Sequence, residues 1–206
     1  LQVTKLGFGA MELRGPSSWR GRELGPRQAD SILNEVLNTG INFIDTSIDY
    51  GDSEELIGKY ISHRRSEYYL ASKCGCMVGD NIPPKGQEFP HLFTRKNIVE
   101  GVEQSLVRMR TEYLDLVQLH GSPSKAILDE YEVIQTLLDL RQQGKVRFIG
   151  TSSTLPNIND HIEMDVFDTF QIPYSALELE HSDVIERAAQ ANSGTIIRGG
   201  IARGYT

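Results

Sequence analysis

The sequence has little cysteine and no excess of positive charge, and each shortage excludes a class of protein. Only two of the 206 residues are cysteines, Cys74 and Cys76, and one residue separates them. Cysteines this close together cannot join distant segments, so a scaffold built on disulfides is excluded. With 21 Lys and Arg against 28 Asp and Glu, the formal charge is −7. Such a chain lacks the broad positive surface that binds nucleic acids or anionic membranes.

Long apolar runs are absent as well. No stretch approaches the ~20 consecutive apolar residues that a membrane-spanning helix needs, so we expect no membrane partner. Together with the scarcity of cysteine, this favours a cytoplasmic location. The content of 39% hydrophobic residues, 19 Gly and 8 Pro is typical of a packed globular domain. The length predicts a single domain over residues 1–206.

Short apolar runs alternate regularly with amphipathic stretches of helical length, a pattern that indicates βα units and a parallel sheet. We expect strands at residues 3–10, 41–45, 68–72, 113–119, 146–151, 167–172 and 195–197. Helical stripes of apolar residues cover residues 32–37, 98–109, 131–138 and 183–192. A stretch rich in Gly and Pro, residues 75–90, follows the third predicted strand, and loops in this position often cover a site.

Seven such units fit either an open doubly wound sheet or an eight-stranded barrel. A doubly wound dinucleotide-binding sheet should carry a G-x-G-x-x-G run after its first strand, but Gly7 and Gly9 are followed by Glu12 at the third glycine position. Polar residues instead follow successive strands, where barrel active sites are built. These residues are Asp45, Tyr50, Lys73, His120, Ser152 and Ser153.

Four of these side chains suggest acid–base chemistry if they converge. A phenol has a reference pKa of about 10 and becomes useful near neutrality when a neighbour favours its ionised form, as Lys73 would for Tyr50. Asp45 is the available counter-charge for a buried Lys73, and His120 would polarise a substrate oxygen. Taken singly, each residue also fits a structural role, such as a turn acceptor, loop packing or a hydrogen-bonded core histidine.

Four segments resemble the signatures of the aldo-keto reductase family. Residues 42–54 are similar to the segment in which an Asp precedes the catalytic Tyr by five residues, here Asp45 and Tyr50. Residues 71–73 resemble the lysine segment, residues 113–120 the histidine strand and residues 144–152 the fifth strand. The resemblance runs from about Gly7 to Gly204.

The resemblance implies a (β/α)8 barrel that binds NADP(H) and reduces an aldehyde or ketone to an alcohol. Tyr50 would be the proton donor, Lys73 held by Asp45 would lower the pKa of Tyr50, and His120 would orient the carbonyl. The positions that match the family's cofactor contacts are Ala10, Met11, Asp45, Ser152, Ser153, Gln171, Arg198, Gly199, Gly200, Ile201 and Arg203. Ser153 departs from the Asn of many members. This chemistry needs no metal, and the sequence shows no Cys/His ligand set that suggests one.

The sequence ends at Thr206 before the eighth strand and the carboxyl-terminal helices that the family barrel needs. We therefore expect a domain that is incomplete at its carboxyl terminus, and at its amino terminus as well, since the sequence begins with Leu1. The identity of the carbonyl substrate, the oligomeric state and a preference for NADP over NAD remain open.

Three alternatives stay open at this point. A non-catalytic, NADP(H)-sensing regulatory subunit of the same family would keep the four residues and act through a partner. An unrelated barrel lyase or isomerase would use Lys73 as a Schiff base. Cys74 and Cys76 flank Lys73, and one of them would be a redox-sensing thiol if the cation lowered its pKa.

Overall fold

The computed structural model describes residues 1–18, 21–79 and 91–200. Its seven strands form one sheet in the order β1 to β7, and each strand pairs in parallel with the next strand along the chain. The strands are β1 (Phe8–Gly9), β2 (Phe43–Asp45), β3 (Tyr69–Cys74), β4 (Leu114–His120), β5 (Val146–Ser152), β6 (Thr169–Pro173) and β7 (Gly194–Arg198).

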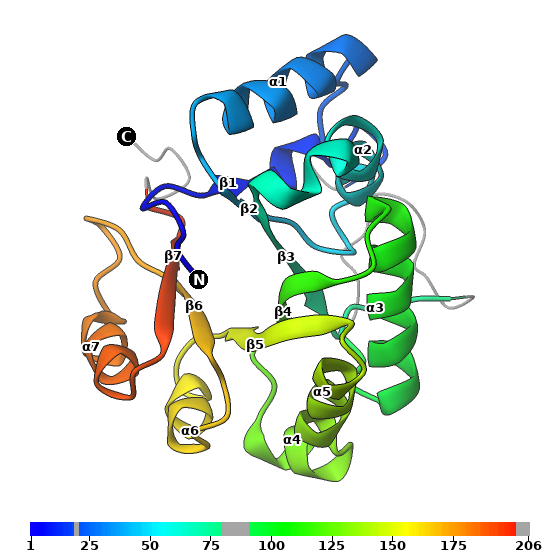
Figure 1. The fold of residues 1–206 in the computed structure, drawn as a ribbon. Helices are drawn as coiled ribbons and strands as arrows, with labels where there is room; N and C mark the ends of the chain where they lie inside the picture. The colour runs from blue at the N-terminus through cyan, green and yellow to red at the C-terminus, as the bar shows by residue number, and fades with distance from the viewer. Residues whose placement is uncertain (19–20, 80–90, 201–206) are drawn as a thin grey trace.

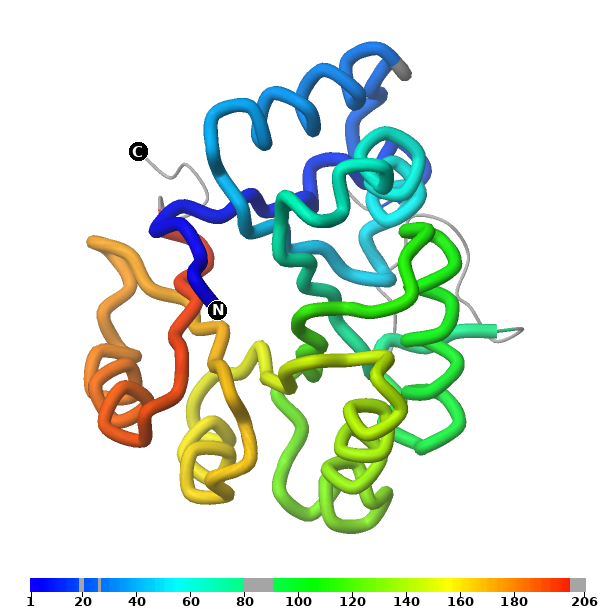
Figure 2. The backbone as a smooth tube through the Cα atoms, viewed as in Figure 1, coloured from blue at the N-terminus to red at the C-terminus, as the bar shows by residue number. Residues whose placement is uncertain are grey.

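Helices connect successive strands and lie on the outer side of the curled sheet (Figure 1). They are α1 (Pro26–Asn38), α2 (Ser53–Tyr60), α3 (Arg95–Met109), α4 (Lys125–Glu130), α5 (Val133–Gln142), α6 (Ile158–Glu163) and α7 (Ser182–Gln190), with short 3₁₀ helices η1 (Ala10–Leu13) and η2 (Ser62–Glu67). Along the chain, the successive strands and helices follow one another around a circle (Figure 2). Among the described residues, no helix is long and apolar enough to cross a membrane.

The strand order distinguishes the two sheet types left open by the sequence. An open doubly wound sheet reverses its strand order at a switch point, whereas this order runs from β1 to β7 without reversal. The fold is therefore that of a (β/α)8 barrel without its eighth strand, as predicted, and β1 and β7 form the two edges among the described residues.

Burial on both faces of the central strands explains their continuous apolar runs. In β4, Leu114, Leu116, Val117 and Leu119 are all buried, as expected for a parallel strand between a barrel interior and covering helices. On the outer side, α3 begins at the cap residue Thr94, whose hydroxyl accepts from the amide of Asn97 at 3.4 Å. The buried apolar side chains form a large cluster shared by strands and helices and a small separate one of Phe43, Ala71 and Leu116.

Two expected elements are wrong in their bounds. The first strand was expected at residues 3–10, but only Phe8–Gly9 joins the ladder, and Thr4 instead bonds Asn42 through side chains, with its amide donating to Oδ1 at 2.7 Å. The expected helix at residues 131–138 begins only at Val133, as α5, because Glu132 adopts a left-handed conformation with φ of 49° between α4 and α5. A change at one residue does not disturb hydrophobic periodicity, so the pattern could not reveal it.

Helices α2, α4 and α6 were not expected from the sequence. Each spans only six to eight residues, which is too short for a clear helical stripe. From residue 80 onward, the expected loop at residues 75–90 lies outside the described residues.

Candidate active site

The polar residues singled out in the sequence lie at the carboxyl ends of neighbouring strands. Asp45 ends β2, Lys73 is the penultimate residue of β3 and His120 ends β4. The ladder pairs His120 with Ser152, and Ser152 with Gln171 on β6. One end of the sheet therefore carries nearly all the expected site residues, as parallel strands of one barrel require.

Lys73 and Asp45 form a buried ion pair. The Lys73 Nζ atom lies 2.7 Å from Asp45 Oδ2 and donates a second bond of 2.7 Å to the carbonyl of Thr46. Gln118 on β4 donates to the other carboxylate oxygen at 2.9 Å. Burial lowers the pKa of Lys73, but the charges of Asp45 and Tyr50 raise it by more, so the lysine stays protonated. A protonated amine is not a nucleophile, so this environment does not favour the Schiff-base alternative.

Tyr50 lies between this pair and the histidine. The Lys73 Nζ atom is 5.0 Å from the centre of the Tyr50 ring, and the rings of Tyr50 and His120 are 6.1 Å apart, edge to face at 84°. The expected lowering of the Tyr50 pKa by Lys73 is outweighed, because burial raises this pKa and the lysine charge only reduces the rise. The phenol is thus held in its protonated form.

A network of buried side chains braces the loop that carries Tyr50. The Ser53 hydroxyl donates to the carbonyl of Ala10 at 3.0 Å and lies 2.8 Å from the Thr46 hydroxyl. Glu54 is fully buried and accepts from the Ser72 hydroxyl at 2.7 Å. Through the first two residues of α2, the loop is therefore tied to η1 and β3.

Arg108 on α3 completes this bracing. Its Nη1 atom donates to the carbonyl of Ile48 at 3.2 Å and to Glu54 Oε2 at 3.5 Å. Burial raises the pKa of Glu54, while Ser72 and Arg108 oppose the rise. Glu54 and Arg108 position the loop without reaching the open side of the site.

His120 is a neutral imidazole in this setting. Burial lowers its pKa to about 4. Its Nδ1 atom lies 3.1 Å from Cys76 Sγ, 3.4 Å from Ser47 Oγ and 3.5 Å from Asp49 Oδ1, and the Ser47 hydroxyl donates to Asp49. At neutral pH the ring therefore offers an N–H group and a lone pair, and carries no charge.

Ser152, which pairs with His120, and Gln171, which pairs with Ser152, are two buried residues with unused hydrogen-bonding capacity. Ser152 and Gln171 are 6% and 3% exposed, and neither side chain makes a hydrogen bond within the described part of the chain. A hydroxyl and a primary amide with this freedom fit a planar carboxamide that both donates and accepts, such as that of a nicotinamide.

The remaining expected cofactor residues are placed differently. The Ser153 hydroxyl is fully buried and lies 2.7 Å from that of Ser122, so it is already engaged. Ala10 is buried and Met11 is exposed, both on η1 at the end of β1. Arg198 ends β7, and exposed glycines at 199 and 200 follow it. The expected contacts Ile201 and Arg203 lie outside the described residues.

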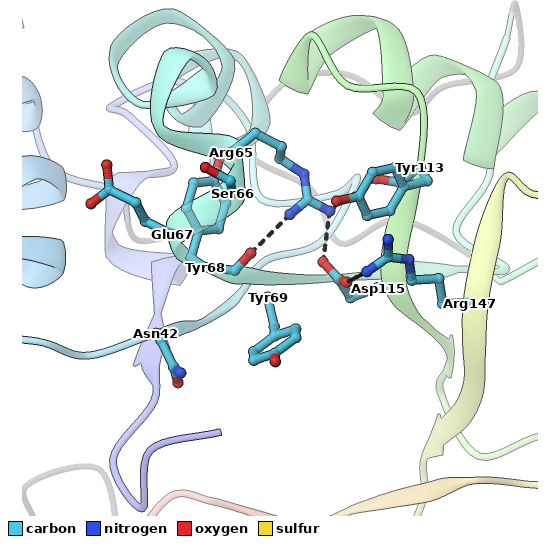
Figure 3. A pocket seen from close by; sticks show the side chains of 9 residues that line it. All are labelled: Asn42, Arg65, Ser66, Glu67, Tyr68, Tyr69, Tyr113, Asp115 and Arg147. Atoms are coloured by element: carbon cyan, nitrogen blue, oxygen red, sulfur yellow. Dashed lines mark hydrogen bonds and ion pairs between the residues drawn. The ribbon is translucent and has the colours of Figure 1, made fainter. Parts of the chain in front are cut away.

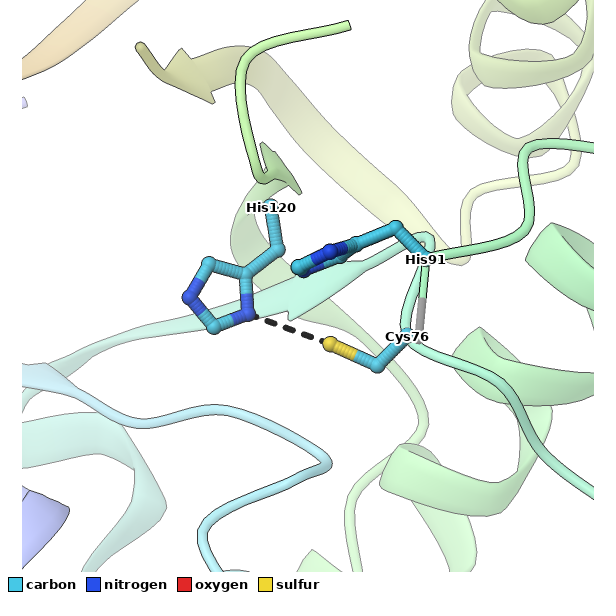
Figure 4. Close-up of side chains that lie close together, drawn as sticks. All are labelled: Cys76, His91 and His120. Atoms are coloured by element: carbon cyan, nitrogen blue, oxygen red, sulfur yellow. Dashed lines mark hydrogen bonds between the residues drawn. The ribbon is translucent and has the colours of Figure 1, made fainter. Parts of the chain in front are cut away.

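Both thiols are buried, and burial raises the pKa of Cys74 to about 12 and that of Cys76 well above its ordinary value. At Cys76 desolvation outweighs the charge of Lys73, which does not favour the hypothesis of a redox-sensing thiol beside Lys73. Cys76 also lies close to two histidines. Its sulfur atom, a ring nitrogen of His91 and a ring nitrogen of His120 all lie within 4.8 Å of one another (Figure 4).

A second pocket, of about 300 Å³, opens at the amino ends of β3, β4 and β5 (Figure 3). Its buried Asp115 accepts from Arg65 at 2.6 Å and from Arg147 at 3.0 Å. Both guanidinium groups also lie over the Tyr113 ring, at 4.3 and 4.1 Å from its centre. Its charges are matched within the protein, so this pocket is not the candidate active site.

Comparison with known proteins agrees with this geometry. The sequence model described as the aldo/keto reductase family matches residues 5–205. The chain belongs to the aldo/keto reductase family. An uncharacterized oxidoreductase of Bacillus subtilis, YqkF, is 31% identical over 208 residues, which cover 99% of this chain and 63% of the relative. The NADH-specific methylglyoxal reductase of Escherichia coli is 27% identical and covers 86% of this chain and 57% of that protein.

The fold of an aldo-keto reductase from Bacillus halodurans, solved in its holo form, is also similar. The TM-score is 0.85 at 29% identity, with 99% of this chain and 64% of that chain covered. The chain spans about 60% of the length of the curated relatives it matches first.

The aldo/keto reductase resemblance identified the four central residues but missed their supports. The sequence did not predict that Gln118 would hold Asp45, or that Glu54 and Arg108 would hold the loop of Tyr50. Glu54 lies within the resembling segment 42–54, and this position was the available signal. His91 and Cys76 gave none, because the contact with His120 joins segments that are far apart in sequence.

Proposed function

We propose that this chain carries the active site of a nicotinamide-dependent reductase that converts an aldehyde or ketone to an alcohol, with Tyr50 as the proton donor. The observation that carries the proposal is the Lys73–Asp45 pair of 2.7 Å, whose ammonium lies 5.0 Å from the centre of the Tyr50 ring, with the His120 ring 6.1 Å from the same ring. The family relationship supports oxidoreductase chemistry in general, and these side chains supply the acid that carbonyl reduction needs.

The proton path begins at the Tyr50 hydroxyl. Because burial raises its pKa, the phenol is protonated at neutral pH and can donate to a carbonyl oxygen. The phenolate left behind is stabilised by the ammonium group of Lys73, which Asp45 and the carbonyl of Thr46 hold in place. The neutral His120 ring would donate a hydrogen bond that orients the same carbonyl oxygen.

The reductant that we propose is NADP(H). When bound, the nicotinamide supplies a hydride to the carbonyl carbon. Ser152 and Gln171 would hold its carboxamide, because both are buried, pair with each other across β5 and β6, and have unused hydrogen-bonding capacity. The other cofactor positions would be Ala10, Met11, Asp45, Ser153, Arg198, Gly199, Gly200, Ile201 and Arg203.

The choice between NADP and NAD needs a direct measurement. One relative is named as NADH-specific, so membership of the family does not fix the choice. Steady-state kcat/KM with NADPH and with NADH, measured on the same aldehyde, decides it. A ratio above about 10 in favour of NADPH supports the proposal, and a ratio below 1 contradicts it.

The proposed role of Tyr50 is tested by Tyr50→Phe. Loss of a positioned general acid lowers kcat by about 10² to 10⁴-fold, whereas nicotinamide binding, followed by quenching of protein fluorescence, should stay within a few-fold of the wild type. The matched control is Tyr131→Phe at an exposed tyrosine between α4 and α5. A Tyr50→Phe protein with near-normal turnover would show that the proton comes from elsewhere.

A further inference from the structure

Three potential metal ligands meet beside the proposed catalytic site. They come from three separate segments: Cys76 from the turn after β3, His91 from the segment that leads to α3, and His120 from the end of β4. Their sulfur and ring nitrogens lie within 4.8 Å of one another, and Cys76 Sγ is 3.1 Å from His120 Nδ1 (Figure 4).

The chemistry of this set matches a zinc-type ion. Thiolate and imidazole are the ligands that Zn²⁺ prefers, at about 2.3 Å for sulfur and about 2.0 Å for nitrogen, which places tetrahedral ligand atoms about 3.5 Å apart. The observed separations require shifts of about 1 Å or less to reach that geometry.

One buried side chain holds the backbone around two of the ligands, Cys76 and His91. Asn97 on α3 donates through its Nδ2 atom to the carbonyl of Cys76 at 2.9 Å and to that of Leu92 at 2.7 Å. Its Oδ1 atom accepts from the amide of Val78 at 3.0 Å. Cys76 and His91 also face each other as a β-bridge. The two segments are therefore fixed relative to each other before any ion arrives, which lowers the cost of assembling a site.

We propose that Cys76, His91 and His120 form a binding site for a divalent transition-metal ion of the zinc type, and that its occupation inhibits the enzyme. The Cys76 thiol loses its proton to solvent when the sulfur coordinates the ion. His91 is exposed and provides the entry path from solvent, while His120 is removed from the carbonyl that it would orient. Binding itself is independent of the proposed function, and only the inhibition rests on it.

The binding test uses tag-free protein titrated with Co²⁺, which reports a thiolate ligand by a charge-transfer band in the near ultraviolet. We expect one Co²⁺ per chain and displacement by Zn²⁺. Cys76→Ser should abolish the band, and His91→Asn should weaken binding at least about 10- to 100-fold, since even outer-shell changes do so. His63→Asn, at an exposed histidine on η2, is the matched control and should bind like the wild type.

X-ray absorption of the Zn²⁺-loaded wild type needs no variant and should show one sulfur and two imidazole ligands. The metal site is overturned if no saturable Co²⁺ band forms, or if Cys76→Ser binds like the wild type, or if the absorption spectrum shows no sulfur.

The inhibition is tested separately. Zn²⁺ should block turnover of the wild type, and His91→Asn should need at least about tenfold more Zn²⁺ while its metal-free turnover is unchanged. Full turnover at saturating Zn²⁺ would overturn the inhibitory role. A wild type that binds Co²⁺ but reduces no carbonyl compound would instead contradict the proposed function and leave the metal site standing.

Discussion

Each end of the sheet holds a carboxylate in an ion pair, Asp115 at one end and Asp45 at the other. The two ends differ in the polar groups that lie beside the ion pair and have no partner within it. At the amino end, both oxygens of Asp115 are used, by Arg65, Arg147 and the amide of Leu70. At the carboxyl end, Asp45 is also saturated, by Lys73 and Gln118. At the carboxyl end, however, further polar side chains with unused hydrogen-bonding capacity lie near the ion pair.

Those further groups decide which end can do chemistry. Tyr50 and His120 are held close to Lys73, and Ser152 and Gln171 keep hydrogen-bonding capacity that no described residue takes up. At the amino end, Arg65 also donates to Thr111 Oγ1 and to the carbonyls of Tyr68 and Tyr113, so its donors are used within the protein. A closed network stabilises the barrel, whereas an open one can accept a ligand.

The largest expected effect is on stability, from Asp115→Ala. This change leaves Arg65 without its buried counter-charge and the amide of Leu70 without an acceptor, so we expect a loss of about 3–5 kcal/mol in the free energy of unfolding. Urea denaturation measures it. The control is Arg147→Gln, whose side chain is 51% exposed and should cost about 1 kcal/mol or less. A loss below about 1 kcal/mol for Asp115→Ala would contradict the claim that the network at the amino end stabilises the barrel.

An intermediate effect is expected from His120 as the pH falls. Its pKa is lowered from 6.5 to about 4 in the folded chain, so the neutral ring stabilises the fold above pH 6.5, and this stability is lost as the pH falls toward 4. The loss between pH 7 and pH 5 should be about 2 kcal/mol. Urea denaturation at several pH values gives the free energy of unfolding of the wild type and of His120→Gln. The difference between their slopes against pH measures the contribution of His120, and equal slopes would contradict the prediction.

The smallest effect is expected from Glu54→Gln at the carboxyl end. The amide keeps the volume of the side chain but turns a donor toward Arg108, so we expect a loss of about 1 kcal/mol in stability. Because Glu54 only positions the loop of Tyr50, kcat should fall several-fold while the pH profile of kcat keeps its shape. A profile shifted along the pH axis would instead place Glu54 among the groups that exchange protons.

Much of this arrangement was predictable from particular residues. The spacing of Asp45 and Tyr50, and the placement of Lys73 and His120 after the next two strands, correctly predicted which side chains converge. The bounds of β1 could not be predicted, because the amino-terminal residues are apolar enough for a strand but bond to Asn42 through side chains. The Cys76–His91–His120 cluster was invisible for a similar reason, since no local pattern marks a contact across 44 residues.

The sequence by itself determined the order of the strands and of the four longest helices, the family and the four residues of the candidate site, because these depend on local periodicity and short motifs. The tertiary structure alone decided the direction of the Tyr50 pKa, the neutral state of His120 and the meeting of Cys76, His91 and His120. Each of these depends on desolvation or on distances between segments that are remote in the chain, and neither quantity exists until the barrel has folded.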